Sequence, residues 1–480
     1  MSSKIVNSFF WKLLERVLAQ GISFVVQVVL ARILLPEDFA NLAIIAAIAN
    51  YATIFIQSGL SVALIQKENL EKEDVSTLLI ASLATASFFY LIVFFIAPVI
   101  ANAYSADILK PTLRVLGIML FLNAINSIQL AMLQREMKFK QIFIRSIIAV
   151  PIAGAISIVM AIKGLGLWAL VSYNVINAFL MVTICFLTNR LKVGWKFSWA
   201  RAKTLYSFSV KILFASLISG LYDTTRTFVV GKKYSKDDLA YYDKAYTYSS
   251  YIVQVVSYSI STVVLPVLSR QQSDIELVKS TTRRAVSMSC FIMFPILLGI
   301  ALVSKPLVLL LLTDKWADCA IFLALFCLLR IPESIIAIDK QAYYAIGKSG
   351  ICLIYEIILC AMNFAALFST LYFGVIYIAI GAVCVEYIAL IIIFIISWKT
   401  YGYSFKDRFF DLLKPTISSL LMCGCVYLVG LLTIGTFKVF LLQVVCGIII
   451  YFLSSFLIKD RNLFDCLCVV KNIFKRKEKV

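Results

Sequence analysis

The sequence predicts an all-α polytopic membrane protein with about fourteen transmembrane helices. Of its 480 residues, 62% are hydrophobic and only 15% are charged, whereas a soluble domain is about half apolar and a quarter charged. The mean hydropathy is +0.94. The apolar residues form continuous blocks of about 20 residues, the length of a helix that crosses the hydrocarbon core. A transmembrane β-barrel would show short alternating strands instead.

The apolar blocks follow one another along the whole chain, and a window of about 19 residues locates them. The expected spans cover residues 10–32, 39–65, 75–101, 108–133, 141–163, 166–188, 204–230, 240–268, 284–304, 317–345, 350–373, 375–398, 411–434 and 437–458. Lysine and arginine gather in alternate loops, such as 134–145, 189–203 and 398–414, a pattern typical of cytoplasmic loops. Both termini are therefore expected in the cytoplasm. The net charge of +19 is explained by these loops facing anionic membrane lipids, so we expect no nucleic-acid partner.

The sequence lacks the patterns on which many enzymes and metalloproteins depend. It contains no histidine, which excludes Ser-His-Asp and Cys-His catalysis and histidine-ligated metals. No GxxxxGK[ST] loop occurs, so the chain carries no P-loop ATPase. The 12 cysteines lie mostly inside apolar runs and lack zinc-ligand spacing. We therefore expect no catalytic residues, no metal and no cofactor, and a function that lies in the helices and the cavity between them.

One polar corner occurs twice in the chain. The stretch RILLPEDFANL, residues 32–42, aligns with KKYSKDDLAYY, residues 232–242, and SFFWKLL (8–14) aligns with SFSVKIL (207–213). The copies lie an even number of spans apart, so both insert with the same orientation. Such parallel repeats, related by an axis along the membrane normal, are typical of transporters.

The repeat predicts how the chain is organised. We expect an N-terminal six-helix lobe in residues 1–200 and a C-terminal six-helix lobe in 201–400, related by a pseudo-two-fold axis. Residues 401–480 add a C-terminal helix pair and a basic cytoplasmic tail. The corners themselves are expected to be structural hairpin ends. Val26 corresponds to Arg226, so the second copy has a cation just inside the shared corner.

Charged side chains within expected spans are costly in a bilayer and tend to face a cavity or each other. Asp223 and Arg226 are three residues apart and share a helix face, as do Arg330 and Glu333. Each pair can be an internal ion pair that offsets its own cost, or can present a cation to an anionic substrate. Arginine suits phosphate because its planar fork binds two oxygens. Lys211 has no partner on its own helix, which favours a cavity role.

Two further groups of residues are candidates for a polar lumen. Glu356 and Glu386 lack a cation nearby in the sequence, so they are candidates, with Glu333, for binding a proton or Na⁺ that drives transport. A helix–helix hydrogen bond is the alternative interpretation. Tyr248 and Tyr251 lie in a span rich in tyrosine, serine and threonine. Their rings can stack on a sugar, next to Asp223 in a polar lumen, or belong to an aromatic belt at the membrane interface.

Several stretches resemble bacterial polysaccharide flippases of the Wzx type. LARILLPEDFANLAIIAAI resembles their first hairpin, in which a helix ends in an L-x-P-E-D-F-G-x-Y-like turn; Ala40 stands where that turn usually has glycine. GKKYSKDDLAYYDKAY, LPVLSR (265–270) and MLQREMKFKQ (132–141) are also similar. The resemblance implies a two-lobed, V-shaped member of the multidrug, oligosaccharidyl-lipid and polysaccharide exporter superfamily, in the bacterial cytoplasmic (inner) membrane.

The resemblance also implies a function. Such a flippase moves undecaprenyl-diphosphate-linked oligosaccharide to the outer leaflet by alternating access, for O-antigen, capsule or exopolysaccharide assembly, and a polysaccharide polymerase is an expected partner. A cationic lumen for the diphosphate would fall on Lys211, Arg226 and Arg330. Other functions remain open: a multidrug/cation antiporter of the same superfamily, with a carboxylate-dominated lumen and twelve spans, a polytopic polysaccharide polymerase or ligase, or a lipid scaffold.

Overall fold

The computed structural model consists of helices joined by short turns. It describes residues 3–57, 64, 71–189, 196–271, 274–432 and 435–465, and no strand occurs among them. Twelve helical segments in these described ranges are long and apolar enough to cross a membrane. Two further expected spans coincide with α9 (Trp199–Lys233) and α10 (Lys236–Arg270), each of 35 residues. The all-α polytopic membrane fold is therefore confirmed, while the count of fourteen spans and the lobe symmetry stay predictions.

The chain folds as two compact units, Met1–Asp243 and Lys244–Val480, so their boundary lies inside α10. The predicted lobe boundaries near residues 200 and 400 refer to a symmetry between repeats, and they stay predictions. Each unit has its own helices and its own buried core.

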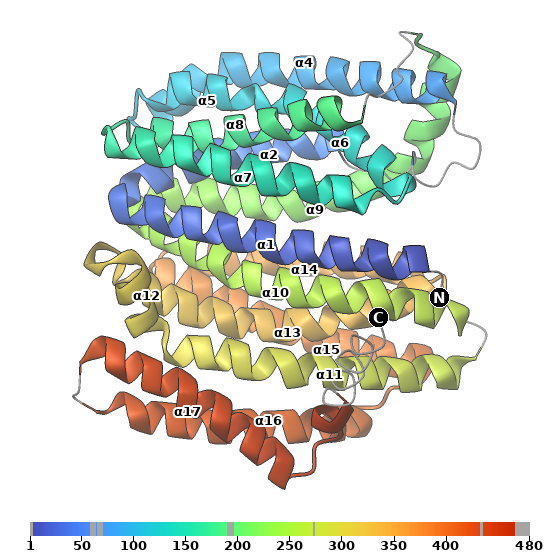
Figure 1. Cartoon of the computed structure of the whole chain (residues 1–480), viewed down its shortest axis with the longest axis vertical. Coiled ribbons are helices and arrows are strands. Elements are labelled where there is room, and N and C mark those ends of the chain that lie inside the picture. The colour runs from blue at the N-terminus through green and yellow to red at the C-terminus, as the bar shows by residue number, and fades with distance from the viewer. Residues whose placement is uncertain are drawn as a thin grey trace. The chain divides into compact units, whose positions relative to one another are not determined.

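The first unit is built around the small and aliphatic side chains of α2, α4, α5, α6 and α8. Its helices are α1 (Ser3–Ile33), α2 (Pro36–Gln57), α4 (Lys72–Ala103), α5 (Leu109–Gly117), α6 (Met119–Arg135), α7 (Phe139–Ile162), α8 (Leu167–Thr188), α9 and the start of α10. In Figure 1, α7 lies between α1 and α8, and α2 packs against α9. The expected span 108–133 is confirmed as one apolar segment, Leu109–Arg135, which is interrupted at Ile118 between α5 and α6. The end of the expected span 39–65 lies outside the described residues, apart from Leu64.

Close packing of α1 on α7 depends on a glycine. A Cβ at Gly154 of α7 would lie 2.5 Å from Cγ2 of Val26 on α1. Ala149, Ala153 and Ser157 continue this buried face of α7. Small residues let membrane helices approach closely, and the contact is then stabilised by van der Waals packing.

The two copies of the polar corner form the same local structure. The Leu35 amide donates to Oδ2 of Asp38 at 3.3 Å, and the Ser235 amide donates to Oδ2 of Asp238 at 3.3 Å. These acids lie in the first turns of α2 and α10, where the helix dipole favours negative charge. In the second corner the Asp238 amide also donates to Oγ of Ser235 at 3.0 Å, which completes a capping box. The corner repeat that the sequence indicates is thus visible in the hydrogen bonds.

The lysines of the second corner contact other parts of the first unit. Lys236 forms an ion pair with Glu37 of the first corner, with Nζ and Oε1 2.6 Å apart. Lys232, at the end of α9, donates to the backbone carbonyl of Ala103. Both lysines therefore have partners within the first unit.

The second unit is built around α11, α13 and α15, which supply most of its buried core. Its helices after α10 are α11 (Ile275–Leu302), α12 (Ser304–Leu312), the 3₁₀ turn η1 (Asp314–Trp316), α13 (Cys319–Ala345), α14 (Ser349–Thr370), α15 (Val375–Tyr401), α16 (Phe405–Gly430) and α17 (Thr436–Leu457). The predicted C-terminal helix pair is confirmed as α16 and α17, which pack on each other, with α16 also on α11 (Figure 1).

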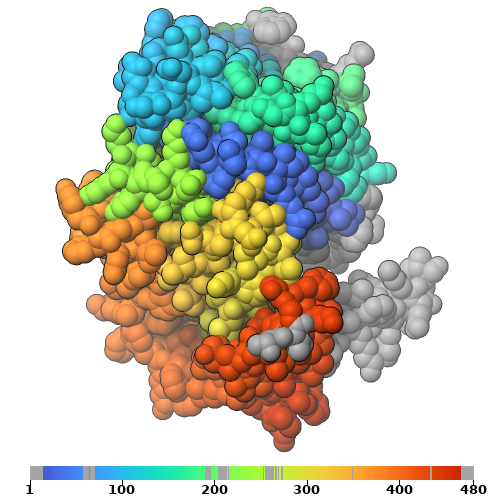
Figure 2. All heavy atoms as spheres, turned by 90° about the vertical axis from the view of Figure 1, so that its left-hand side faces the viewer, coloured from blue at the N-terminus to red at the C-terminus, as the bar shows by residue number. Residues whose placement is uncertain are grey.

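The outward faces of the second unit's helices are apolar. Tyr372, Leu428, Phe437 and Leu457 each expose more than 60% of their surface. In Figure 2, which shows one face of the molecule, the later part of the chain is orange and red. Many exposed apolar side chains are typical of helices that face lipid, in agreement with a membrane location.

Candidate transport-site residues

Arg226 on α9 forms the ion pair that the sequence predicts. Its Nη1 lies 2.8 Å from Oδ1 of Asp223, whose side chain is 48% exposed, whereas that of Arg226 is only 6% exposed. The guanidinium carbon lies 5.6 Å from the ring centre of Tyr222 and 5.3 Å from that of Tyr242. Aromatic faces stabilise a desolvated cation, so the arginine is held inside the unit while its acid reaches the surface. Lys211 also lies on α9, but its side chain is outside the described part of the structure.

A tyrosine ties α9 to the end of α4 near Arg226. The Tyr104 hydroxyl donates to the backbone carbonyl of Phe228 at 3.0 Å. Burial raises the pKa of Tyr104 to about 12, so the phenol stays a neutral donor at physiological pH. This contact fixes the segment of α9 that carries Arg226.

Arg330 on α13 has several hydrogen-bond partners. It is 5% exposed, and its Nη1 donates to Oε2 of Glu333 at 2.6 Å. Nη2 donates to the Tyr246 carbonyl at 3.3 Å, and Nε donates to Oγ of Ser249 at 3.4 Å. The guanidinium also lies 4.4 Å from the Tyr246 ring centre. The predicted pair with Glu333 is formed, and α10 supplies the remaining contacts.

The structure brings four predicted residues and one further lysine into one group in the second unit. Lys340 on α13 forms an ion pair with Glu356 on α14, with Nζ and Oε1 2.5 Å apart. Glu386 on α15 interacts electrostatically with Arg330, Glu333, Lys340 and Glu356. We call these five residues the charge cluster. Lys340 is absent from the sequence-based candidates because its partner is on another helix. Its position inside the expected span 317–345 could have identified it as a candidate.

Tyr248 and Tyr251 lie one helical turn apart on α10. Their ring centres are 6.4 Å apart. Tyr248 is 7% exposed, and the buried Lys244 amine lies 5.4 Å from its ring centre. Tyr248 therefore packs on a cation inside the second unit, and a role of either ring in binding sugar stays a prediction.

Two other buried arginines come from cation-rich stretches of the sequence. Arg145, which belongs both to the stretch 134–145 and to the expected span 141–163, lies on α7 and is 4% exposed, and its Nη1 donates to Oδ1 of Asn126 at 3.0 Å. Arg408, from the expected loop 398–414, forms a bidentate pair with Asp339, with nitrogen–oxygen distances of 2.9 and 3.1 Å. Each of these two stretches therefore contributes an arginine that is buried inside the helix bundle.

The Asp339–Arg408 pair joins α13 to the start of α16. The two side chains are 0% and 1% exposed, and the hydroxyl of Tyr401 also donates to Asp339. The Arg408 guanidinium lies 3.9 Å from the ring centre of Tyr403, and Tyr403 donates to Asp411 at 2.8 Å. Burial, with the nearby Asp411 carboxylate, raises the pKa of Tyr403. A buried bidentate pair fixes the position of one helix relative to another, so we interpret it as structural.

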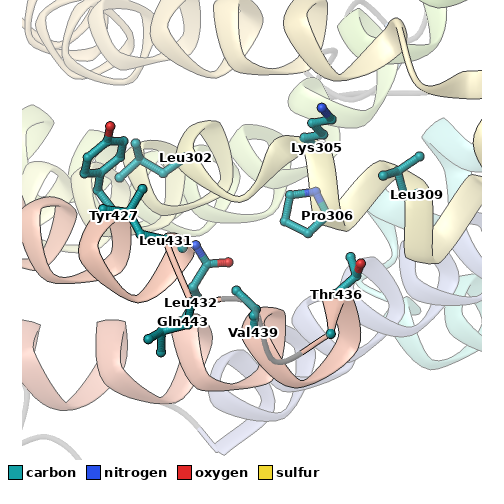
Figure 3. Close-up of a pocket in the computed structure, with 12 residues that line it drawn as sticks. Leu302, Lys305, Pro306, Leu309, Tyr427, Leu431, Leu432, Thr436, Val439 and Gln443 are labelled. Atoms are coloured by element: carbon teal, nitrogen blue, oxygen red, sulfur yellow. The ribbon is translucent and has the colours of Figure 1, made fainter.

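A pocket elsewhere in the second unit is lined by none of these residues. No group of three or more metal-binding side chains occurs in the described part of the chain. A pocket of about 540 Å³ opens between the α11–α12 corner and the α16–α17 turn. Figure 3 shows Lys305 and Pro306 on one side of it and Val439 and Gln443 on the other. Gly430 makes room for the Gln443 amide, since a Cβ there would lie 2.7 Å from Nε2.

Comparison with known proteins places this fold in a family. The family described as "Polysaccharide biosynthesis protein" matches residues 29–321, more than half of the chain. The chain belongs to this family. This agrees with the resemblance to polysaccharide flippases seen in the sequence.

Individual relatives of the polysaccharide biosynthesis family are distant. The succinoglycan biosynthesis transport protein ExoT of Rhizobium meliloti (strain 1021) is 23% identical over 65% of this chain, and the match spans 63% of the relative's length. The lipopolysaccharide biosynthesis protein WzxC of Escherichia coli (strain K12) is 22% identical over 70% of this chain and 68% of its own length. The solved structure of a lipid II flippase, MurJ, in an inward closed conformation has a TM-score of 0.77 at 19% identity, covering 95% of this chain and 99% of that one. The fold is therefore that of the lipid II flippase structure.

Proposed function

We propose that the protein is a flippase for undecaprenyl-diphosphate-linked oligosaccharide repeat units. It would move them from the inner to the outer leaflet of the bacterial cytoplasmic membrane for O-antigen, capsule or exopolysaccharide assembly. One observation carries the proposal: a multi-span chain of the polysaccharide biosynthesis family, with a flippase fold, buries arginines inside apolar helices. Ionisable residues retained inside a membrane, despite their cost, usually serve a substrate path.

The buried cations suit a diphosphate. Arg226 and Arg330 each keep a carboxylate three residues away, and these carboxylates are 48% and 42% exposed. Each acid orients its guanidinium in the absence of substrate, and the planar fork can then bind phosphate oxygens as the substrate enters. Lys211, on the same helix as Arg226, would add a third cation. Asp223, Tyr248 and Tyr251 would provide polar and aromatic surface for the sugars.

The carboxylates of the charge cluster are the candidates for energy coupling. Glu333, Glu356 and Glu386 would bind a proton or Na⁺ in one conformation and release it in the other. Alternating access then follows when the ion changes the balance between the two conformations.

The location and partner follow from the same proposal. Both termini would be cytoplasmic, as the positions of lysine and arginine predict. Because the product appears on the outer leaflet, a polysaccharide polymerase on that side would consume it.

The decisive experiment measures where the repeat units accumulate. A strain that lacks the gene should hold lipid-linked repeat units on the cytoplasmic leaflet, inaccessible to a sugar-modifying enzyme added outside spheroplasts. A copy of the gene on a plasmid should restore their accessibility. If the repeat units reach the outer leaflet of the deletion strain at the normal rate, the proposed flippase function is wrong.

A multidrug/cation antiporter is the second candidate. The charge cluster favours it, since three carboxylates outnumber two cations there. Efflux of a cationic dye from vesicles that contain the purified chain, with no effect of the gene on repeat-unit location, would select this function. A polymerase or ligase would instead show glycosyl transfer by the purified protein.

A further inference from the structure

A polar pocket of about 540 Å³ lies in the second unit, away from the charge cluster. It is formed by the first third of α11, the first turns of α16 and the helical residues 461–465 that follow α17. Its charged lining includes Arg284, Lys414, Arg461, Asp411, Asp460 and Asp465. The pocket of Figure 3 lies at the other end of α11 and α16, where α12 and the start of α17 complete its lining, and Lys305 on α12 is the charged side chain among its lining residues.

Two cations of the polar pocket have no carboxylate partner. Lys414 donates to the backbone carbonyl of Lys459 at 3.0 Å and has no ion pair with any residue that the structure describes. Arg461 is exposed and makes neither a hydrogen bond nor an ion pair within the same described ranges. Arg284 is also 65% exposed, although it pairs with Asp465. Cations placed together in this way attract a negatively charged group.

One carboxylate oxygen of a buried acid in the same pocket accepts no hydrogen bond from the described residues. Asp460 is 1% exposed, and its Oδ1 accepts hydrogen bonds from the amide and the Nδ2 of Asn462, both at 2.9 Å. Its Oδ2 is buried without a hydrogen-bond partner among the described residues. An unsatisfied buried carboxylate oxygen is destabilising, and an ammonium group is the partner that would stabilise it most.

The exposed ring of Phe410 lines the pocket, and further exposed phenylalanines lie next to its lining residues in the sequence. Phe409 and Phe410 on α16 are 62% and 57% exposed, and Phe464 is 43% exposed. Aromatic and basic side chains at helix ends are typical of the membrane interface. We therefore expect this pocket at the level of the lipid headgroups, on the side that the loop charges predict to be cytoplasmic.

We propose that this pocket binds the headgroup of a phosphatidylethanolamine from the adjacent leaflet. The phosphate lies between Lys414 and Arg461, the ammonium donates to Oδ2 of Asp460, and the acyl chains extend along the phenylalanines. A pocket of this volume accepts a small-molecule-sized group. The proposal is independent of the flippase activity, because it uses none of the candidate transport residues.

The test compares lipids on the purified, unaltered full chain by native mass spectrometry. Phosphatidylethanolamine, phosphatidylcholine and phosphatidylglycerol with identical acyl chains are added in equal amounts. Phosphatidylethanolamine should bind best, because the quaternary ammonium of phosphatidylcholine has no N–H to donate to Asp460. Equal binding of phosphatidylcholine, or stronger binding of phosphatidylglycerol, would overturn the proposal. If soluble phosphoethanolamine competes with the lipid when both are at the same concentration, the conclusion that the bound headgroup comes from a membrane lipid is wrong.

Variants locate the site. Lys414→Gln with Arg461→Gln should lower binding about tenfold, since each basic side chain near the membrane contributes to attraction of lipid phosphate. Lys305→Gln, on α12 in the pocket of Figure 3, is the matched control and should leave lipid binding unchanged. Asp460→Asn should abolish the preference over phosphatidylcholine while keeping binding of the phosphate. A folded double variant that binds phosphatidylethanolamine as the unaltered chain does would place the lipid elsewhere.

Discussion

At the scale of the residue, Arg330 is held by more partners than a simple ion pair provides. Its three guanidinium nitrogens, Nη1, Nη2 and Nε, donate to Glu333, the Tyr246 carbonyl and Ser249. This arrangement satisfies a charge that would be costly in a bilayer. It also fixes the plane of the guanidinium, so that the phosphate of the proposed substrate would meet a side chain that is already oriented.

Two substitutions of Arg330 distinguish the contribution of its positive charge from that of its planar guanidinium. Arg330→Ala should lower export of repeat units roughly tenfold or more, because hydrogen bonds to charged groups contribute about 1.5–3 kcal/mol each. Arg330→Lys should recover only part of the activity, since lysine keeps the charge but lacks the fork. Export is measured as surface polysaccharide relative to the amount of protein in the membrane.

Arg270→Ala is the control for this series, because Arg270 is an exposed arginine at the end of α10. It should export normally. Full activity of Arg330→Ala at a normal protein level would remove Arg330 from the substrate path.

The sequence predicts some of these residue contacts and not others, for a geometric reason. The pairs Asp223–Arg226 and Arg330–Glu333 follow from helical spacing alone, and both are formed. Lys340–Glu356 joins two helices, and Asp339–Arg408 joins residues that are 69 positions apart. Such pairs depend on how the helices pack, which spacing along one helix does not encode.

At the scale of the element, helix packing in this protein depends on small side chains. Gly154 lets α7 approach α1 so closely that any Cβ would meet Val26. The sequence identifies the helices because long apolar runs are unambiguous. It does not identify which glycines lie at contacts, since Gly21 and Gly154 both stand within spans, and only Gly154 has a close neighbour.

We expect Gly154→Ala to destabilise the first unit by about 1–3 kcal/mol, the typical effect of adding a methyl group to a packed contact. Gly21→Ala on α1 is the matched control, because nothing lies within 4 Å of its Cβ position. That change should be neutral or slightly stabilising, since alanine favours the helix. Thermal unfolding in detergent, followed by tryptophan fluorescence, measures both. Equal melting temperatures for the two variants would contradict the packing argument.

At the scale of the whole molecule, the repeated corners show how much of the architecture is visible in the sequence. The alignment of residues 32–42 with 232–242 corresponds to matching hydrogen bonds at Asp38 and Asp238. The contact between Glu37 and Lys236 was not predictable, because it depends on α2 and α9 lying side by side. An exposed ion pair of this kind adds little stability, so it can form and break during a transport cycle.

A crosslink tests whether the corners separate. Cysteines at Glu37 and Lys236, in a background without native cysteines, should react with a short bifunctional thiol reagent and stop export. The same reagent should not affect either single cysteine variant. Export that continues when the corners are fully crosslinked would show that they stay together throughout the cycle.

The charge cluster has an electrical consequence. With all five members ionised, two cations and three carboxylates leave one net negative charge on α13, α14 and α15. Moving one elementary charge across a membrane potential changes the free energy by about 2.3 kcal/mol per 100 mV. Any conformational step that shifts this cluster along the membrane normal is therefore driven or opposed by the potential of the cell, and the rate of export would depend on how strongly the membrane is energised.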